Sequence, residues 1–434
     1  MTRYIFFFLF LLIFPGCIRL PSSNACDTTQ TKFLSLILLK DILEDHSSLC
    51  WNKRNTSQTS TSSETKACNL SYTQIADAAH WEIVKKEMNL QIAKGVNGSE
   101  AVVQFSSSVT SVLGGSSSEA FQGGIASPNG KIYFLPYASS KYHELDSSTG
   151  IPNAFGSTPA YAASIGGSLG TGGKIYLAPH QDNVFRSINT NDNSIENYGT
   201  DTNLGIGSQA YSGSVSAPNG KIYFVPNSEP YVRYIDTKDN SIGRIATTVA
   251  GSFSAGVLAS NGFIYLIPFG SNSVQYIDTK DDTIHSIGPT LPNANKYINA
   301  TLAPNGKIYL TPYDETQFRY IDTNNNTVVD FETPLSSSPS GKFNGNVLAP
   351  NGRIYLIPYN NATFTYIDTA NDTITNFGTN PNSPTNTTFR GGALASDGKI
   401  YLAPHNIDNY YYIDTKSVGS FCDSIRLSYY WNKQ

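Results

Sequence analysis

Residues 346–378 read NVLAPNGRIYLIPYNNATFTYIDTANDTITNFG, and versions of this stretch recur along most of the chain. The shared core is Gly, usually a basic residue, Ile, Tyr, two further residues and Pro, and it occurs seven times between residues 124 and 415. The repeated glycines, at spacings of 42 to 47 residues, are Gly130, Gly173, Gly220, Gly262, Gly306, Gly352 and Gly398.

This period predicts the fold. A repeat in the forties that is rich in strand formers and contains Asn-Gly turns is typical of a four-stranded propeller blade and not of a helical repeat. Seven copies therefore predict an all-β fold, a seven-bladed β-propeller of four-stranded antiparallel blades.

The strands of one blade can be placed on the quoted copy. The predicted strands are residues 347–349, 353–357, 364–368 and 373–377. A tight turn at Asn351-Gly352 joins the first two, because both residues accept a positive φ. Ile354 and Tyr355 point to opposite faces of the sheet, so we expect one to pack on the preceding blade and the other on the next.

Two further positions repeat in every copy. Small residues are expected just before the innermost strand, where seven strands converge: Gly124, Gly167, Ser214, Gly256, Ala300, Asn346 and Gly392. A proline is expected to end the second strand, because it has no amide donor. These prolines are Pro136, Pro179, Pro226, Pro268, Pro312, Pro358 and Pro404.

The ends of the repeat region predict how the ring closes. A strand-like segment at 107–113 precedes the first repeat, whereas the last repeat stops after its third strand, 411–414. We therefore expect the last blade to combine three C-terminal strands with one N-terminal strand, which removes the free sheet edges. The alternative is that residues 418–421 complete this blade.

The N-terminus predicts export. Residues 1–16 place Arg3 before a short apolar run and read as a signal peptide, too short to span a membrane as a helix. The string Ile-Phe-Pro-Gly-Cys, residues 13–17, resembles a bacterial lipoprotein cleavage box of the looser spirochaete type. That resemblance implies lipidation of Cys17 and attachment to the outer membrane or cell surface. Cleavage near residues 22–25, which would release a free secreted protein, is the alternative.

The remaining segments are assigned by composition and periodicity. Residues 17–30 are expected to be a lipidated tether and residues 31–100 a helical N-terminal segment, with helices at 31–46 and 72–94. The propeller is assigned to 107–416 and a C-terminal tail to 417–434. The cysteines Cys26, Cys50, Cys68 and Cys422 are disulfide candidates in an exported chain, and we expect Cys422 to pair with the N-terminal segment.

The charge pattern excludes nucleic acid as a partner. Charged residues make up 14% of the chain, the net charge is −4, and the basic residues are scattered one to a repeat. The Asp of the Ile-Asp-Thr motif, such as Asp368, is expected to accept hydrogen bonds from turn amides and not to bind a metal. His180 and His405 occupy equivalent positions, but most copies have another residue there, so the sequence predicts no metal and no cofactor.

The repeat also resembles a known family. The segment PNGKIYLIPYNNATFTYIDTANDTI, a composite of the copies, resembles the YVTN-type propeller repeat at Asn351-Gly352, Tyr355 and 367–369. It differs at Pro358, where that family usually has Asn. The Gly-Lys-Ile-Tyr core is more loosely similar to kelch repeats, whose double-glycine and Trp signatures are absent. The resemblance implies the fold and brings no enzymatic residues.

The loops predict where function lies. Two of the four loop sets vary between copies, and antiparallel topology puts both sets on one face, where we expect recognition. The candidate binding residues follow the prolines: Tyr137, His180, Phe269, Tyr313, Tyr359 and His405, with the acids Asp182, Glu229, Asp314, Glu315 and Asp408 nearby. We expect a non-catalytic surface lipoprotein that binds a protein or carbohydrate partner. The alternatives are a propeller lyase or hydrolase with a site in the central funnel, and a structural envelope protein.

Overall fold

The computed structural model describes residues 79–419, apart from 107, 110–118, 128, 159–161, 163, 201–208, 292–294, 333–334, 336–338 and 383–386. The chain divides into two compact units, Met1–Glu64 and Thr65–Gln434, and every described residue belongs to the second. The signal peptide, Cys17, the 31–46 helix and all four disulfide candidates lie outside the described residues.

Seven four-stranded antiparallel sheets make up the described part, and each is one blade. Blade 1 contains β2 (Phe121–Ala126), β3 (Lys131–Pro136), β4 (Tyr142–Asp146) and β5 (Ile151–Phe155). Blade 2 contains β6 (Ser164–Leu169), β7 (Lys174–Pro179), β8 (Val184–Asn189) and β9 (Ile195–Thr200), with a short 3₁₀ turn at Thr171–Gly173. Blade 3 contains β10 (Tyr211–Ser216), β11 (Lys221–Pro226), β12 (Tyr231–Asp236) and β13 (Ser241–Thr248). Blade 4 contains β14 (Phe253–Leu258), β15 (Phe263–Pro268), β16 (Val274–Asp278) and β17 (Thr283–Ile287).

The remaining blades follow the same order. Blade 5 contains β18 (Tyr297–Leu302), β19 (Lys307–Pro312), β20 (Arg319–Asp322) and β21 (Thr327–Asp330). Blade 6 contains β22 (Phe343–Leu348), β23 (Arg353–Pro358), β24 (Thr363–Asp368) and β25 (Thr373–Thr379). Blade 7 contains β26 (Phe389–Leu394), β27 (Lys399–Pro404), β28 (Tyr410–Asp414) and β1 (Ala101–Ser106).

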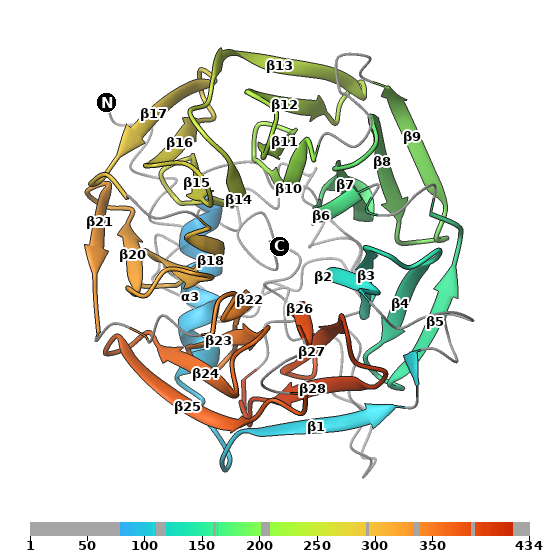
Figure 1. The fold of residues 1–434 in the computed structure, drawn as a ribbon, viewed down its shortest axis with the longest axis vertical. Coiled ribbons are helices and arrows are strands. Elements are labelled where there is room, and N and C mark those ends of the chain that lie inside the picture. Colours follow the sequence, from blue (N-terminus) through green and yellow to red (C-terminus); the bar gives the residue numbers. More distant parts are fainter. Residues whose placement is uncertain are drawn as a thin grey trace, which may run out of the picture. The chain divides into compact units, whose positions relative to one another are not determined.

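The blades form a closed ring (Figure 1). Each innermost strand contacts the innermost strand of the next blade, from β2 through β6, β10, β14, β18 and β22 to β26, and β26 contacts β2 again. The predicted seven-bladed propeller is confirmed. Each second strand ends at its predicted proline.

An N-terminal strand closes the ring, as predicted, but the prediction assigned this strand to the wrong residues. The closing strand is β1, Ala101–Ser106, which pairs antiparallel with β28, for example Val102 with Ile413. The expected segment 107–113 does not form it, and neither does the alternative at 418–421, so the ring includes residues before the predicted start at 107. Phe105 explains the choice, because its ring packs against Tyr401, Tyr410 and Tyr412 of the last blade.

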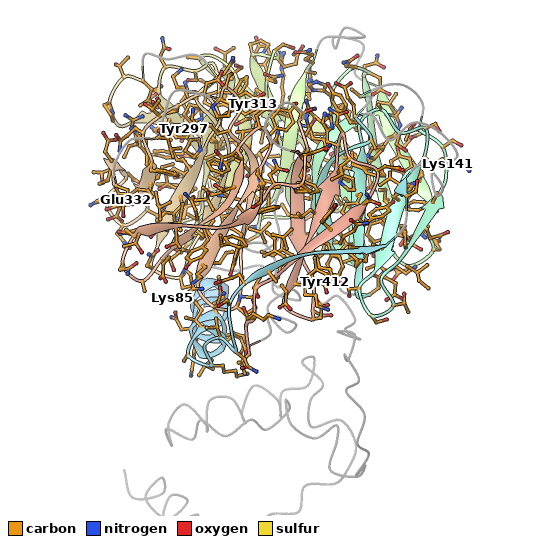
Figure 2. All side chains as sticks on the ribbon, turned by 60° about the horizontal axis from the view of Figure 1, so that its bottom comes forward. Lys85, Lys141, Tyr297, Tyr313, Glu332 and Tyr412 are labelled. Carbon is orange, nitrogen blue, oxygen red and sulfur yellow. The ribbon has the colours of Figure 1, made fainter. Side chains whose placement is uncertain are left out.

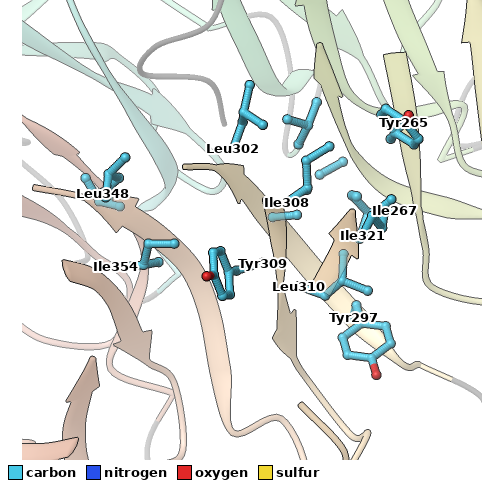
Figure 3. Close-up of a cluster of buried hydrophobic side chains, with 14 of the residues drawn as sticks. Tyr265, Ile267, Tyr297, Leu302, Ile308, Tyr309, Leu310, Ile321, Leu348 and Ile354 are labelled. Carbon is cyan, nitrogen blue, oxygen red and sulfur yellow. The ribbon is translucent and has the colours of Figure 1, made fainter. Parts of the chain in front are cut away.

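The repeated Ile and Tyr hold neighbouring blades together. Tyr309 of blade 5 and Ile354 of blade 6 belong to one buried cluster (Figure 3). In the same way, Tyr133 of blade 1 shares a cluster with Ile175 of blade 2. Burying one such side chain contributes roughly 1.5–3 kcal/mol, so this repeated contact is a main source of the ring's stability. The predicted packing of the two residues on opposite neighbours is confirmed.

Turn residues add directional bonds between blades. Asn305, in the turn after β18, donates from its amide to the carbonyl of Thr369 in the next blade at 3.0 Å. Thr369 donates from its hydroxyl to the Gly352 carbonyl at 2.6 Å. Asp368 accepts from the Ala370 amide at 3.0 Å, so its predicted turn-capping role is confirmed.

One helix, α3 (Ala79–Ile92), is described, and it lies within the helix predicted at 72–94. Met88 is fully buried, and Ile92 lies against Gly352 in the turn between β22 and β23. The helix is therefore on the face opposite the loops that follow the prolines, as Figure 2 shows for Lys85 and Tyr313. No helix in the described part of the chain is long and apolar enough to cross a membrane.

Candidate axial binding site

Each innermost strand contains a β-bulge at its second residue. Pairing with the neighbouring strand shifts register just after the first residue in all seven blades, as between Phe121 and Gly124 or between Phe389 and Gly392. In four blades the third residue is a glycine in the left-handed region, with φ values of 63° to 103°. Such bulges re-aim side chains and often lie next to functional sites.

These second residues surround a cavity on the axis of the ring. The cavity has a volume of about 130 Å³. It is lined by the second residue of every innermost strand: Gln122, Ile165, Ser212, Ser254, Ile298, Asn344 and Arg390. Phe269 and Asn227, each directly after a proline, also line it. The lining is mostly amide, hydroxyl and apolar, and Arg390 is its only charged residue among those described.

Arg390 is held by neutral partners. Its guanidinium donates to the Tyr359 hydroxyl at 2.8 Å and to Gln122 Oε1 at 3.1 Å. It also lies over the rings of Tyr137 and Tyr359, at 4.7 and 5.2 Å from their centroids. Burial lowers the pKa of Arg390, but its interactions with Tyr359 and Tyr137 raise this pKa by more. The pKa of Arg390 is therefore raised. The cavity therefore contains a fixed positive charge.

Five of the predicted binding residues form a continuous row, which we call the aromatic arc. The ring centroids lie 5.8 Å apart for Phe269 and Tyr313, and 6.1 Å apart for Tyr313 and Tyr359. The row continues from Tyr359 to His405 at 5.9 Å and from His405 to Tyr137 at 6.0 Å. The structure thus brings together residues from blades 4, 5, 6, 7 and 1, next to Arg390.

The members of the arc differ in exposure. Tyr359 is 6% exposed and His405 is fully buried, whereas Tyr137, Phe269 and Tyr313 are half-buried. The rings that a ligand can reach are therefore those of Tyr137, Phe269 and Tyr313.

The two histidines do not share a site. His180 is 5% exposed, and its Nδ1 bonds to the carbonyl of Tyr211 at 2.8 Å, outside the aromatic arc. His405 Nδ1 bonds to the carbonyl of Phe121 at 3.3 Å. Burial and the nearby Arg390 charge lower the pKa of His405 to about 3, so the ring is neutral at pH 7. No group of His, Cys, Asp and Glu in the described residues could hold a metal.

The acids expected near the site are engaged elsewhere, and none lines the cavity. Asp182 pairs with Arg186 at 2.7 Å, and Glu315 pairs with Arg319 at 3.2 Å. The others interact with loop groups, as Asp314 does with Ser340 and Asp408 with Ser108, and Glu229 is half-buried. These acids therefore leave the charge of the cavity positive.

Arg390, Gln122 and Asn344 were missed from the sequence. The small residues such as Gly392, expected before the innermost strand, lie inside it at its fourth position, because each strand begins three residues earlier. The overlooked signal is that one position of the repeat varies from blade to blade. The residue two positions before each small residue is Gln, Ile, Ser, Ser, Ile, Asn or Arg, although the second strands are nearly uniform.

Comparison with known proteins supports the fold. No protein-family model and no curated protein matches the chain. Among solved structures, a streptogramin B lyase matches with a TM-score of 0.60 at 16% identity, covering 73% of this chain and 97% of that one. A catalytically inactive virginiamycin B lyase from Staphylococcus aureus with quinupristin matches with a TM-score of 0.59 at 15% identity, covering 72% and 99%. The WD40 β-propeller domain of Doa1 matches with a TM-score of 0.55 at 9% identity, covering 74% and 99%. At these identities the likeness shows a β-propeller and nothing finer.

Proposed function

We propose that this chain is an exported, lipid-anchored binding protein, not an enzyme, and that its propeller receives a glycan partner at the axial cavity. The observation that carries the proposal is the aromatic arc beside this cavity, on the face where the variable loops lie. Half-buried aromatic rings next to neutral hydrogen-bonding groups bind both the apolar face and the hydroxyl groups of a sugar.

The chemistry of the lining favours binding over catalysis. A lyase or hydrolase needs a group that gives or takes a proton near neutral pH. The described lining contains no carboxylate, histidine, lysine or cysteine, and Arg390 keeps its proton. His405 is close, but a pKa of about 3 makes it a weak base. An enzyme is the second candidate, supported by the likeness to the two lyases in fold.

The anchoring part of the proposal rests on the sequence. The apolar run before Cys17 and the low content of charged residues suit a protein carried to the cell surface.

A matched pair of substitutions tests the proposed function. Phe269→Ala removes a half-buried ring at the cavity, whereas Phe263→Ala removes a half-buried ring at the other end of the same strand, β15. We expect the wild-type chain and Phe263→Ala to bind the same sugars on a glycan array and Phe269→Ala to lose them. Equal binding by both variants, or no binding by the folded wild-type chain, would contradict the proposal. Thermal unfolding of all three proteins checks that they are folded.

A further inference from the structure

We infer that the axial cavity recognises the carboxylate of an acidic sugar, with Arg390 as the ion-pairing group. This inference rests on the proposed glycan-binding function and specifies its ligand. The blades differ at the second residue of the innermost strand, and only blade 7 supplies a charged side chain there. The chemistry of the cavity is therefore not symmetric around the ring.

The positive charge has no counterion among the described residues. The guanidinium donates to the oxygens of Gln122 and Tyr359, which are both neutral, and no carboxylate of the described residues forms an ion pair with it. A half-buried cation without an anion is costly, because it has lost part of its hydration. A ligand carboxylate would compensate for the lost hydration of the guanidinium. Guanidinium groups bind carboxylates by charge-assisted, often bidentate hydrogen bonds.

Arg390 is also held in place before any ligand binds. The guanidinium lies over the rings of Tyr137 and Tyr359, and it donates to Gln122 of the neighbouring blade 1. Long side chains normally lose conformational freedom on binding, and a side chain that is already fixed avoids most of that cost. The arrangement is that of a prepared anion site and not of a mobile surface arginine.

The rest of the lining favours a sugar over an acidic peptide. Gln122, Asn344 and Asn227 supply amides, and Ser212 and Ser254 supply hydroxyl groups, so neutral donors and acceptors surround the charge. Hydroxyl groups of a sugar ring can pair with these side chains, whereas the aliphatic stem of Asp or Glu cannot. The cavity has a volume of about 130 Å³. It admits a carboxylate and the adjoining part of one sugar ring, which indicates a terminal acidic residue.

The test compares sugars with and without a carboxylate. Calorimetric titration of the wild-type chain with methyl glucuronide, methyl glucoside and N-acetylneuraminic acid should show at least tenfold tighter binding of an acidic sugar than of the neutral one. Arg390→Gln should remove this preference and leave weak binding of methyl glucoside. Arg390→Lys should recover only part of it, because Lys cannot pair bidentately.

A second variant covers the case in which Arg390→Gln does not fold. Asn344→Asp places a carboxylate of nearly equal size in the lining, on the neighbouring blade 6. It should neutralise the positive charge of Arg390 and lower the affinity for acidic sugars tenfold or more.

The possible results separate the inference from the proposed function. Equal affinity for charged and neutral sugars, or an acidic preference that persists in Arg390→Gln and in Asn344→Asp, overturns the inference and leaves glycan binding intact. Tighter binding of an N-acetylglutamate peptide than of either acidic sugar overturns the assignment to a sugar. Absence of any sugar binding, with a folded Phe269→Ala variant that matches the wild type, overturns both.

Discussion

Glu100 accepts a hydrogen bond from Arg353, which lies 253 positions later in the chain, and forms an ion pair with it. In blades 3 and 5 the equivalent acceptor comes from the turn between the third and fourth strands of the next blade. Asp282, for example, accepts from Lys221 at 2.5 Å and from Tyr223 at 2.7 Å. Blade 7 has no such turn, because its fourth strand is the N-terminal β1. Glu100, directly before β1, takes the place of the missing turn residue.

The first prediction concerns this closing contact. Glu100→Ala should lower the free energy of unfolding by about 1–3 kcal/mol, because it removes the shorter of the two ion pairs of the partly buried Arg353, whose other partner, Asp368, lies at 3.7 Å. Urea unfolding measures the change. Glu87→Ala, on α3, should have an effect of at most a few tenths of a kcal/mol, since the hydrogen bond that Glu87 accepts comes from Gln91, one turn later on the same helix. An unchanged midpoint for Glu100→Ala would show that the ring closes without this contact.

A tyrosine hydroxyl between blades gives the second prediction. Tyr309 is fully buried and donates to Asp372 of the next blade at 2.5 Å. Tyr309→Phe should cost about 1–2 kcal/mol by chemical denaturation, because a hydrogen bond to a charged group is lost. Tyr366→Phe is the control, because the contacts of Tyr366 are made by its ring and not by its hydroxyl. It should change stability by less than about 0.5 kcal/mol, and equal effects of the two substitutions would argue against the role of the hydroxyl.

Two glycines that share a left-handed backbone give the third prediction. Gly166, at the bulge of β6, has φ 63°, and an added Cβ would lie 2.7 Å from the Ser212 carbonyl oxygen. Gly172 has φ 72° and nothing within 4 Å. Gly172→Ala should cost about 1 kcal/mol for conformation alone, and Gly166→Ala should cost a further 1–3 kcal/mol for the clash. Differential scanning calorimetry should therefore show the larger fall in Tm for Gly166→Ala, and the reverse order would contradict close packing at the axis.

Acid sensitivity is the fourth prediction. Burial, with a contribution from Arg390, lowers the pKa of His405 to about 3, compared with 6.5 for the free side chain. Between these values the unfolded chain binds the proton and the folded chain does not. Stability due to this group is thus complete above about pH 6.5 and falls as the pH decreases, by about 1.4 kcal/mol per pH unit. His143 is buried in the same way, with a pKa of about 4, and adds to the effect.

Unfolding at pH 7 and pH 5 measures this dependence. His405→Gln should reduce the loss of stability between the two pH values by about 2 kcal/mol, since one titrating group is removed. The carboxyl group of Glu144 does not confuse the result, because its pKa is lowered and it titrates below this window. Identical pH profiles for wild type and His405→Gln would show that the histidine takes up a proton without unfolding.

Lipid attachment is the fifth prediction. If Cys17 is the lipidated residue, an expressing bacterium grown with a labelled fatty acid should incorporate the label into the wild-type chain. Cys17→Ser should abolish the label and release the protein from the membrane fraction. Cys26→Ser should keep it and serves as the control. An unlabelled wild-type chain with a mature N-terminus near residues 22–25 would support cleavage to a free secreted protein instead, and label retained in Cys17→Ser would show that another residue carries the lipid.

The sequence by itself determined the number of blades, the arrangement of four antiparallel strands in a blade and the contacts between neighbouring blades. These features depend on local and repeated chemistry: Asn-Gly turns, the alternation of Ile and Tyr, and prolines that end a hydrogen-bonded ladder. Each of these features depends on a few neighbouring residues, so a single repeat of 42 to 47 residues contains all the information needed to predict it.

Only the tertiary structure decided which residues meet at the axis and which strand closes the ring. Arg390 and Gln122 are 268 residues apart and meet because blades 7 and 1 are neighbours in a closed circle. The bulge that turns them toward the cavity is a property of strand pairing and not of any one segment. The closing strand was misplaced for a related reason. Several short segments before the first repeat could form a strand, and the choice of Ala101–Ser106 depends on where Phe105 packs on the last blade.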